Sequence, residues 1–264
     1  MFIKNNQIAS QLYVPYTKNL KALGQSARRL STGEKFPTGA DGGGELGVAD
    51  RWKSVISGTN KLIDGMENSM GYLAVQDESI TQATVVIQRM SELAASALDT
   101  SKNTNDRIAL DAEFQALENE FSTISARQYN GTAIFGTSID VRVGVTAGDT
   151  LTLSSISLAA ITFGSMALSQ LAGADTALVS LTSRISSLNV FRARAGNNSN
   201  ELSRTIDFTR QFTRSLGNAE NFVRNIDIAL EAGEFTKQQV VLAASQSVLS
   251  QANNLTQSGL QFLG

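Results

Sequence analysis

The fold of this chain is decided by residues 178–230, which read LVSLTSRISSLNVFRARAGNNSNELSRTIDFTRQFTRSLGNAENFVRNIDIAL. Eight residues stand at every seventh position, and all of them except Thr209 are apolar. They are Leu181, Leu188, Ala195, Leu202, Thr209, Leu216, Val223 and Leu230. A second apolar row, at Leu178, Ile185 and Ile206, lies three positions earlier. Two rows at this spacing are typical of a helix that packs along another helix. The stretch predicts a long coiled-coil helix that Gly233 ends.

A second long helix is expected upstream, from the end of the glycine-rich stretch 39–47 to about residue 100. Its apolar row runs from Ile63 to Ala97 and is interrupted at Gln76 and Asp77. Both prolines of the chain lie before residue 38, so no proline breaks this helix. A shorter helix should follow the polar turn 101–106, because Leu110, Phe114, Leu117, Phe121 and Ile124 share one helical face.

Between these helices the apolar period changes from seven to two. Val141 and Val143 alternate with polar or small residues, and so do Leu151 and Leu153, with Ala147-Gly148-Asp149 between the two runs. This pattern predicts a β-hairpin at about residues 139–153. Asn130-Gly131 predicts a tight turn. Residues 155–175 have no clear periodicity and are left unassigned.

Each end of the chain carries a further apolar stripe at coiled-coil spacing. We call these the terminal stripes; their residues are Leu20, Leu23, Ala27 and Leu30 near one end, and Val241, Val248, Leu255 and Phe262 near the other. Pro15 interrupts the first stripe and is expected to kink its helix or to delay its start. Neither end is long enough to bury its stripe alone, so we expect both to be largely disordered until they pack against partners.

The composition excludes several classes of function. Neither Cys nor His is present among the 264 residues, which removes thiol nucleophiles, imidazole bases and the usual zinc ligands. The formal net charge of -2 argues against nucleic-acid binding. No apolar run is long enough to insert into a membrane, and residues 1–10 lack the layout of a cleaved signal peptide. Gly42, Gly44 and Gly47 match a dinucleotide-binding spacing, but no strand precedes them. We therefore expect no enzyme, no metal and no cofactor.

Five motifs in order resemble those of bacterial flagellins. They are Arg29-Leu30-Ser31-Thr32-Gly33 with Gly47-Val48-Ala49-Asp50-Arg51-Trp52, then Ile87-Gln88-Arg89-Met90-Ser91-Glu92-Leu93-Ala94, Gln128-Tyr129-Asn130-Gly131, Val143-Gly144 and Val248-Leu249-Ser250-Gln251-Ala252-Asn253. The resemblance covers nearly the whole chain. It implies a mainly α-helical fold, with a long antiparallel helical rod, a small β-hairpin and terminal helices that pair on assembly.

The resemblance also implies a function and a place. A flagellin is exported unfolded by the flagellar type III apparatus, without a cleaved signal peptide, and polymerises outside the cell into the motility filament. Residues 1–36 and 232–264 would form the inner tube and residues 37–231 the surrounding layer, without an outer variable domain. The implied partners are other flagellin copies, an export chaperone, and filament cap or junction proteins.

Arg89, Leu93 and Glu113 occupy positions that match the surface which innate immunity reads in this family, so a Toll-like receptor is a further expected partner. Two alternative functions stay open. A hook-filament junction protein would share the same helices and stripes. A secreted membrane-active translocator would place its amphipathic ends on lipid.

Overall fold

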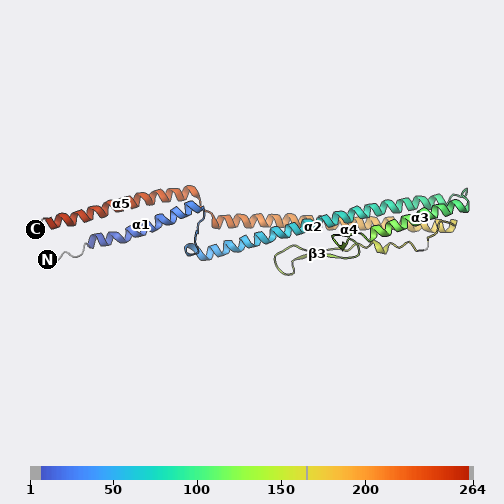
Figure 1. Cartoon of the computed structure of the whole chain (residues 1–264), viewed down its shortest axis with the longest axis horizontal. Coiled ribbons are helices and arrows are strands. Elements are labelled where there is room, and N and C mark those ends of the chain that lie inside the picture. Colours follow the sequence, from blue (N-terminus) through green and yellow to red (C-terminus); the bar gives the residue numbers. More distant parts are fainter. Residues whose placement is uncertain (1–6, 165, 262–264) are drawn as a thin grey trace. The chain divides into compact units, whose positions relative to one another are not determined.

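The computed structural model describes the backbone of residues 7–164 and 166–261, and side-chain burial for residues 11–254 except residue 165. The chain forms two compact units (Figure 1). Unit 1 contains residues 1–56 and 215–264, and unit 2 contains residues 57–214. The predicted inner tube and surrounding layer are parts of the polymer. A division within one chain does not test them, so they stay a prediction.

Long helices dominate the fold, as the sequence predicted. The helices are α1 (Gln7–Thr32), α2 (Gly39–Ala97), α3 (Thr104–Ser125), α4 (Leu171–Arg224) and α5 (Ile228–Gln261), with a short 3-10 helix, η1, at Leu158–Ala160. The strands form two antiparallel pairs, β1 (Gln128–Tyr129) with β2 (Thr132–Ala133) and β3 (Ile139–Arg142) with β4 (Thr150–Leu153). The pair β3–β4 is the predicted hairpin. Asn130 and Gly131 make the predicted turn between β1 and β2, with φ of 49° and 79°.

The core of unit 2 lies between α2, α3, α4 and the chain that crosses them. Met66, Leu73, Ile80, Ile87 and Ala94 repeat every seven residues along α2, and all are buried. The predicted row on α4 is buried from Leu181 through Thr209. Heptad rows on two facing helices thus close into one core, because each row lies where a neighbouring helix covers it.

Gln76 breaks the apolar row of α2 for a structural reason. Its side chain is buried at a heptad position, and its amide nitrogen donates to the carbonyl of Ile134, at 2.5 Å. Tyr72, one turn earlier, donates its hydroxyl to the carbonyls of Ala133 and Ile134. The polar break therefore holds the backbone after β2 against α2, since a buried carbonyl must find a donor.

Polar side chains also fix the ends of α2 and α3 and the end of β4. Arg107 donates to the carbonyls of Ala97 and Asp99 and so satisfies the C-terminus of α2, while Asn103 and Asp106 form a capping box on α3. On α4, the Asn198 side-chain amide donates to the carbonyl of Ser154 and accepts from its N–H group. These contacts place the hairpin on α4.

Three helix boundaries differ from the sequence predictions. The glycine-rich stretch is part of α2 from Gly39 onward, with a kink at Gly42. Pro15 lies inside α1, which begins at Gln7, so the delayed start of this helix is wrong, whereas the kink stays a prediction. The break before the last helix falls at residues 225–227, and Gly233 lies inside α5. Asp227 explains this position, because its carboxylate accepts from the N–H groups of Ala229 and Leu230 at the start of α5.

Candidate assembly surface

The surface of interest is the pair formed by α1 and α5, which lie side by side in unit 1 (Figure 1). Between residues 228 and 254 of α5, the partly buried residues follow one strict row. Steps of four and three alternate along it: Glu231, Phe235, Gln238, Leu242, Ser245, Leu249 and Ala252. This is the spacing of a coiled-coil contact row. We call these residues the paired row of α5.

A matching row on α1 faces inward, and polar contacts join the two helices. The inward residues are Leu12, Tyr16, Asn19, Leu23, Ser26 and Leu30. Ser26 donates to Glu231 at 2.6 Å, and Gln246 donates to the Tyr16 hydroxyl at 3.3 Å. Among the described side chains of α1 and α5, Ser26 alone is buried. The pair is therefore only half covered.

The terminal stripes divide between the inner and outer faces of this pair. Leu23 and Leu30 belong to the inward row of α1, whereas Leu20 and Ala27 are exposed. Val241 and Val248 lie beside the paired row of α5, and both are exposed. The side chain of Leu255 and all of Phe262 lie outside the described residues. The assembly role of the terminal stripes stays a prediction.

Several other large apolar side chains on the terminal pair are also open to solvent. Tyr13 and Val14 on α1, and Ile228, Leu230 and Val240 on α5, keep 61–75% of their surface exposed. Covering one such side chain stabilises by about 1.5–3 kcal/mol. Several exposed apolar side chains on one helix pair favour a surface that another protein covers.

Unit 2 carries a separate apolar groove of about 610 Å³. One wall is the turn of the β3–β4 hairpin, residues 143–150, and the other is formed by Thr205, Phe208, Thr209 and Phe212 of α4. Phe208 is 72% exposed, and Phe212 and Val145 are also open to solvent. Sequence analysis missed this groove, although Phe208 and Phe212, four residues apart off the heptad rows, were the available signal.

The structure brings together two of the three residues expected at the immune-recognition surface. Arg89 of α2 forms an ion pair with Glu113 of α3, with 2.8 Å between Nη2 and Oε1. The hydrogen bonds to Glu113 and Glu92 raise the pKa of Arg89, which keeps it charged. Leu93 is buried in the core of unit 2. The ion pair is thus at the surface, whereas the Leu93 side chain faces inward.

Neither a metal-binding group nor a membrane-spanning helix is found in the part of the chain that the structure describes. No group of three or more acidic side chains in that part could hold a metal ion. A search of its helices for a long apolar segment found none that could cross a membrane.

Comparison with known proteins gives two family models in sequence order. Residues 3–139 match the bacterial flagellin N-terminal helical region, and residues 171–263 match the bacterial flagellin C-terminal helical region. Together the matches include α1 and α2 on one side and α4 and α5 on the other.

Individual relatives agree with these models over half or more of this chain. The flagellin of Halalkalibacterium halodurans is 26% identical over 271 residues, with 100% of both chains covered. The flagellar filament 33 kDa core protein of Treponema phagedenis is 25% identical, and the match covers 90% of this chain and 91% of the relative. The crystal structure of Bacillus cereus flagellin matches with a TM-score of 0.50 and 26% identity, over 54% of this chain and 86% of that one.

Proposed function

The chain belongs to the bacterial flagellin family, and from that membership we propose that it is a structural subunit of the flagellar filament. The observation that carries this proposal is the half-covered pair of α1 and α5. Val241, Val248 and Leu20 present apolar surface that the described residues of the same chain leave uncovered. In the filament, neighbouring copies cover these side chains.

Polymerisation follows from the kind of contact proposed. A copy that covers the outer side of α5 with a different part of its own surface makes a heterologous contact, and such contacts grow without limit when they do not close into a ring. Residues 1–36 and 232–264 then form the inner tube, and residues 37–231 form the layer around it. The filament lies outside the cell, as expected for a flagellin.

The groove of unit 2 supplies a second contact in this proposal, and its occupant is another copy. The argument is charge complementarity. α4 carries six arginines against two carboxylates between residues 184 and 214, whereas α3 carries five carboxylates against one arginine. Some of these charges already pair within the chain, as Arg210 does with Glu67 and Glu113 with Arg89. The opposite excess charge on the two helices favours contact between the α3 surface of one copy and the α4 surface of the next. Phe208→Asp should raise the concentration needed for polymerisation, and unchanged polymerisation of this variant would remove the groove from the proposal.

Export and further partners belong to the same proposal. Export in an unfolded state by the flagellar type III apparatus, an export chaperone, and filament cap or junction proteins follow from family membership. Recognition by a Toll-like receptor through Arg89, Leu93 and Glu113 is tested by reporter cells that receive purified monomer. Because Leu93 is buried, the receptor would have to bind chiefly through the two charged residues. Cells that give no response would discard this partner.

Val248→Asp tests the filament role directly. A carboxylate at this exposed position costs little in the subunit, but it would be buried without a partner once a copy covers α5. We expect unchanged thermal unfolding of the subunit and no filaments by negative-stain electron microscopy. Val248→Leu, which keeps the position apolar, is the matched control and should polymerise.

Normal filaments from Val248→Asp would refute the role of the terminal stripes. Short oligomers from the unaltered protein, in place of filaments, would favour the hook-filament junction protein. Leakage of liposomes on addition of the protein would favour the membrane-active translocator.

A further inference from the structure

The Asn130-Gly131 turn between β1 and β2 places a side-chain amide beside an open backbone nitrogen. Among the residues that the structure describes, Asn130 alone has a positive φ without being glycine, and Gly131 follows it at φ 79°. Tyr129 pairs with Thr132 and so closes the turn, which leaves the N–H of Gly131 outside the hydrogen-bonded ladder. Both turn residues are exposed. The nitrogen and the amide are therefore open to water.

The surroundings of Gly131 leave room for a ring to form. Apart from its neighbours in the chain, no atom lies within 4 Å of the position that a Cβ of Gly131 would occupy. Glycine brings no side chain to shield its nitrogen, and its backbone reaches conformations that other residues rarely adopt. The nitrogen of Gly131 can thus approach Cγ of Asn130 and close a five-membered ring with it.

We propose that Asn130 is a site of spontaneous deamidation, in which the nitrogen of Gly131 is the nucleophile and water is the second reactant. This nitrogen gives its proton to solvent hydroxide and bonds to Cγ of Asn130. The bond from Cγ to Nδ2 breaks, and the side-chain nitrogen takes a proton from water and leaves as ammonia, so that a cyclic imide remains. Water then adds to one imide carbonyl, whose bond to the ring nitrogen breaks. The product is aspartate or isoaspartate, depending on which carbonyl reacts.

Asn68 shows what the turn contributes to this chemistry. Like Asn130, it is exposed, and a small residue, Ser69, follows it. However, both lie inside α2, where each backbone N–H donates to the carbonyl four residues earlier and the dihedral angles are fixed. The nitrogen of Ser69 can attack only after the helix opens locally. The two sites therefore differ in backbone conformation and not in exposure.

Isoaspartate would disturb contacts that hold this turn on α2. Tyr72 donates its hydroxyl to the carbonyls of Ala133 and Ile134. The side chain of Gln76 donates to the carbonyl of Ile134 as well. Isoaspartate adds a methylene to the main chain of a two-residue link, and the length of such a link sets the register of the strands that it joins. Because the reaction runs one way and needs no enzyme, the altered fraction increases with the age of the protein.

Peptide mass spectrometry on the full-length protein tests the site. Trypsin releases residues 128–142, in which Asn130 is the only asparagine, and residues 62–89, in which Asn68 is the only one. After several weeks in mildly alkaline buffer, conversion should be about tenfold greater in the first peptide, because reaction at Asn68 first requires local opening of α2. A sample digested at the start gives the background. In water enriched in oxygen-18, the product should carry one heavy oxygen.

Two variants separate the loss of the amide from the added methylene. Asn130→Gly keeps a favoured turn sequence and should show no conversion of residues 128–142. Freshly prepared Asn130→Asp carries the new carboxylate without the longer main chain. The N–H of Ile134 donates to the carbonyl of Arg127. We expect this amide to exchange about tenfold faster in the isolated isoaspartate form than in Asn130→Asp, because local opening is more frequent where anchoring contacts are lost.

Equal conversion of the two peptides in the unaltered protein would overturn the assignment of Asn130. Equal exchange of the Ile134 amide in the isoaspartate form and in Asn130→Asp would overturn the effect on the turn. Neither measurement depends on polymerisation, so this inference and the filament role can fail separately.

Discussion

Unit 2 and the α1–α5 pair use the same seven-residue repeat with opposite results. On α2 the repeat places Met66, Leu73 and Ile80 in a buried core. On α5 the repeat leaves every described residue at least partly exposed. The neighbouring elements make the difference. In unit 2, α2 is covered by α3, α4 and the segments between them, whereas among the described residues α1 is the element that packs along α5. A heptad repeat therefore specifies a contact row, and the surroundings decide whether that row becomes a core.

This difference separates what each region needs in order to be stable. Unit 2 buries its large side chains within one chain and is expected to fold as a monomer. The terminal pair leaves Val240 and Leu230 uncovered, so its stability should depend on protein concentration through assembly. Disorder of the free ends in the unassembled subunit remains a prediction.

The largest expected effect comes from opening a cavity in unit 2. Phe114 of α3 is fully buried, so Phe114→Ala should lower the free energy of unfolding by about 3–5 kcal/mol. Phe208→Ala, which removes the same ring from an exposed site, should change it by less than about 0.5 kcal/mol. Urea unfolding followed by far-UV circular dichroism measures both variants. If both variants changed the free energy of unfolding equally, unit 2 would have no core of its own. The contrast with the α1–α5 pair would then be wrong.

A smaller effect is expected in unit 1, at the kink of α2. Gly42→Ala forces a methyl group into the ring of Phe36 and should destabilise unit 1 by about 1–3 kcal/mol. Gly43→Ala is the matched control, because no atom lies within 4 Å of its Cβ position and alanine favours a helix by up to about 1 kcal/mol. Trp52 is the only tryptophan and lies in unit 1, so its fluorescence during urea unfolding reports this unit. Similar midpoints for the two variants would show that the glycine kink does not hold Phe36.

The smallest effect is a pH dependence confined to unit 2. Burial raises the pKa of Glu118 above its ordinary value of 4.5, and the nearby Arg184 opposes this only in part. Because the folded state favours the protonated carboxyl, the contribution to stability is complete below the ordinary value and is lost as the pH rises through the raised pKa.

Glu118→Gln should remove this loss. Above the raised pKa the variant should be more stable than the unaltered protein by no more than about 0.5 kcal/mol, since the side chain is partly screened by solvent. Thermal unfolding of unit 2 across the acidic range measures the difference. A variant that follows the unaltered protein at every pH would contradict the assignment.

Much of the fold could be predicted because helix and strand periods differ. Local sequence patterns predict the apolar rows of α2 and α4, the hairpin and the Asn130-Gly131 turn. In each helix the predicted apolar row is the one that the fold buries. Gln76 could not be predicted as a core residue, since its partner, the Ile134 carbonyl, is set by tertiary structure. The helix end predicted at Gly233 was wrong, because glycine is tolerated inside an exposed helix. The carboxylate of Asp227, which accepts from the N–H of Ala229, marks the start of α5 instead.

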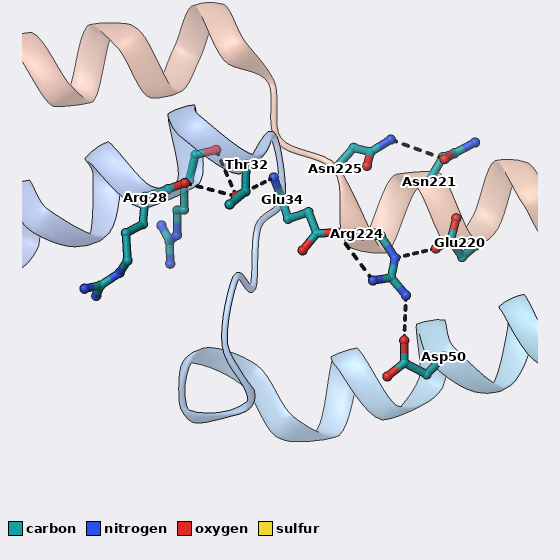
Figure 2. A network of polar contacts seen from close by, with 9 residues as sticks. Arg28, Thr32, Glu34, Asp50, Glu220, Asn221, Arg224 and Asn225 are labelled. Atoms are coloured by element: carbon teal, nitrogen blue, oxygen red, sulfur yellow. Dashed lines mark hydrogen bonds and ion pairs between the residues drawn. The ribbon is translucent and has the colours of Figure 1, made fainter.

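The candidate site was predictable in kind but only partly in detail. The terminal stripes identify α1 and α5 as the helices that need partners. They do not tell which side of α5 meets α1, because Leu242 and Val241 are adjacent and equally apolar. Arg224 could be paired from the sequence only with Glu220, four residues earlier on the same helix. Its other two carboxylate partners, Glu34 and Asp50, lie far from it in the chain and meet it only in the folded state (Figure 2).

The two hydrogen bonds between the Asn198 side chain and the backbone of Ser154 have a consequence for solubility. A two-stranded hairpin has two open edges, and unpaired backbone groups along an edge invite strands of other molecules to add on. The side-chain amide of Asn198 occupies both backbone groups of the residue that follows β4, so part of one edge is already satisfied from within the molecule. Part of one edge of the β3–β4 ribbon is thereby closed to strands of other molecules, which lowers the tendency of this segment to aggregate.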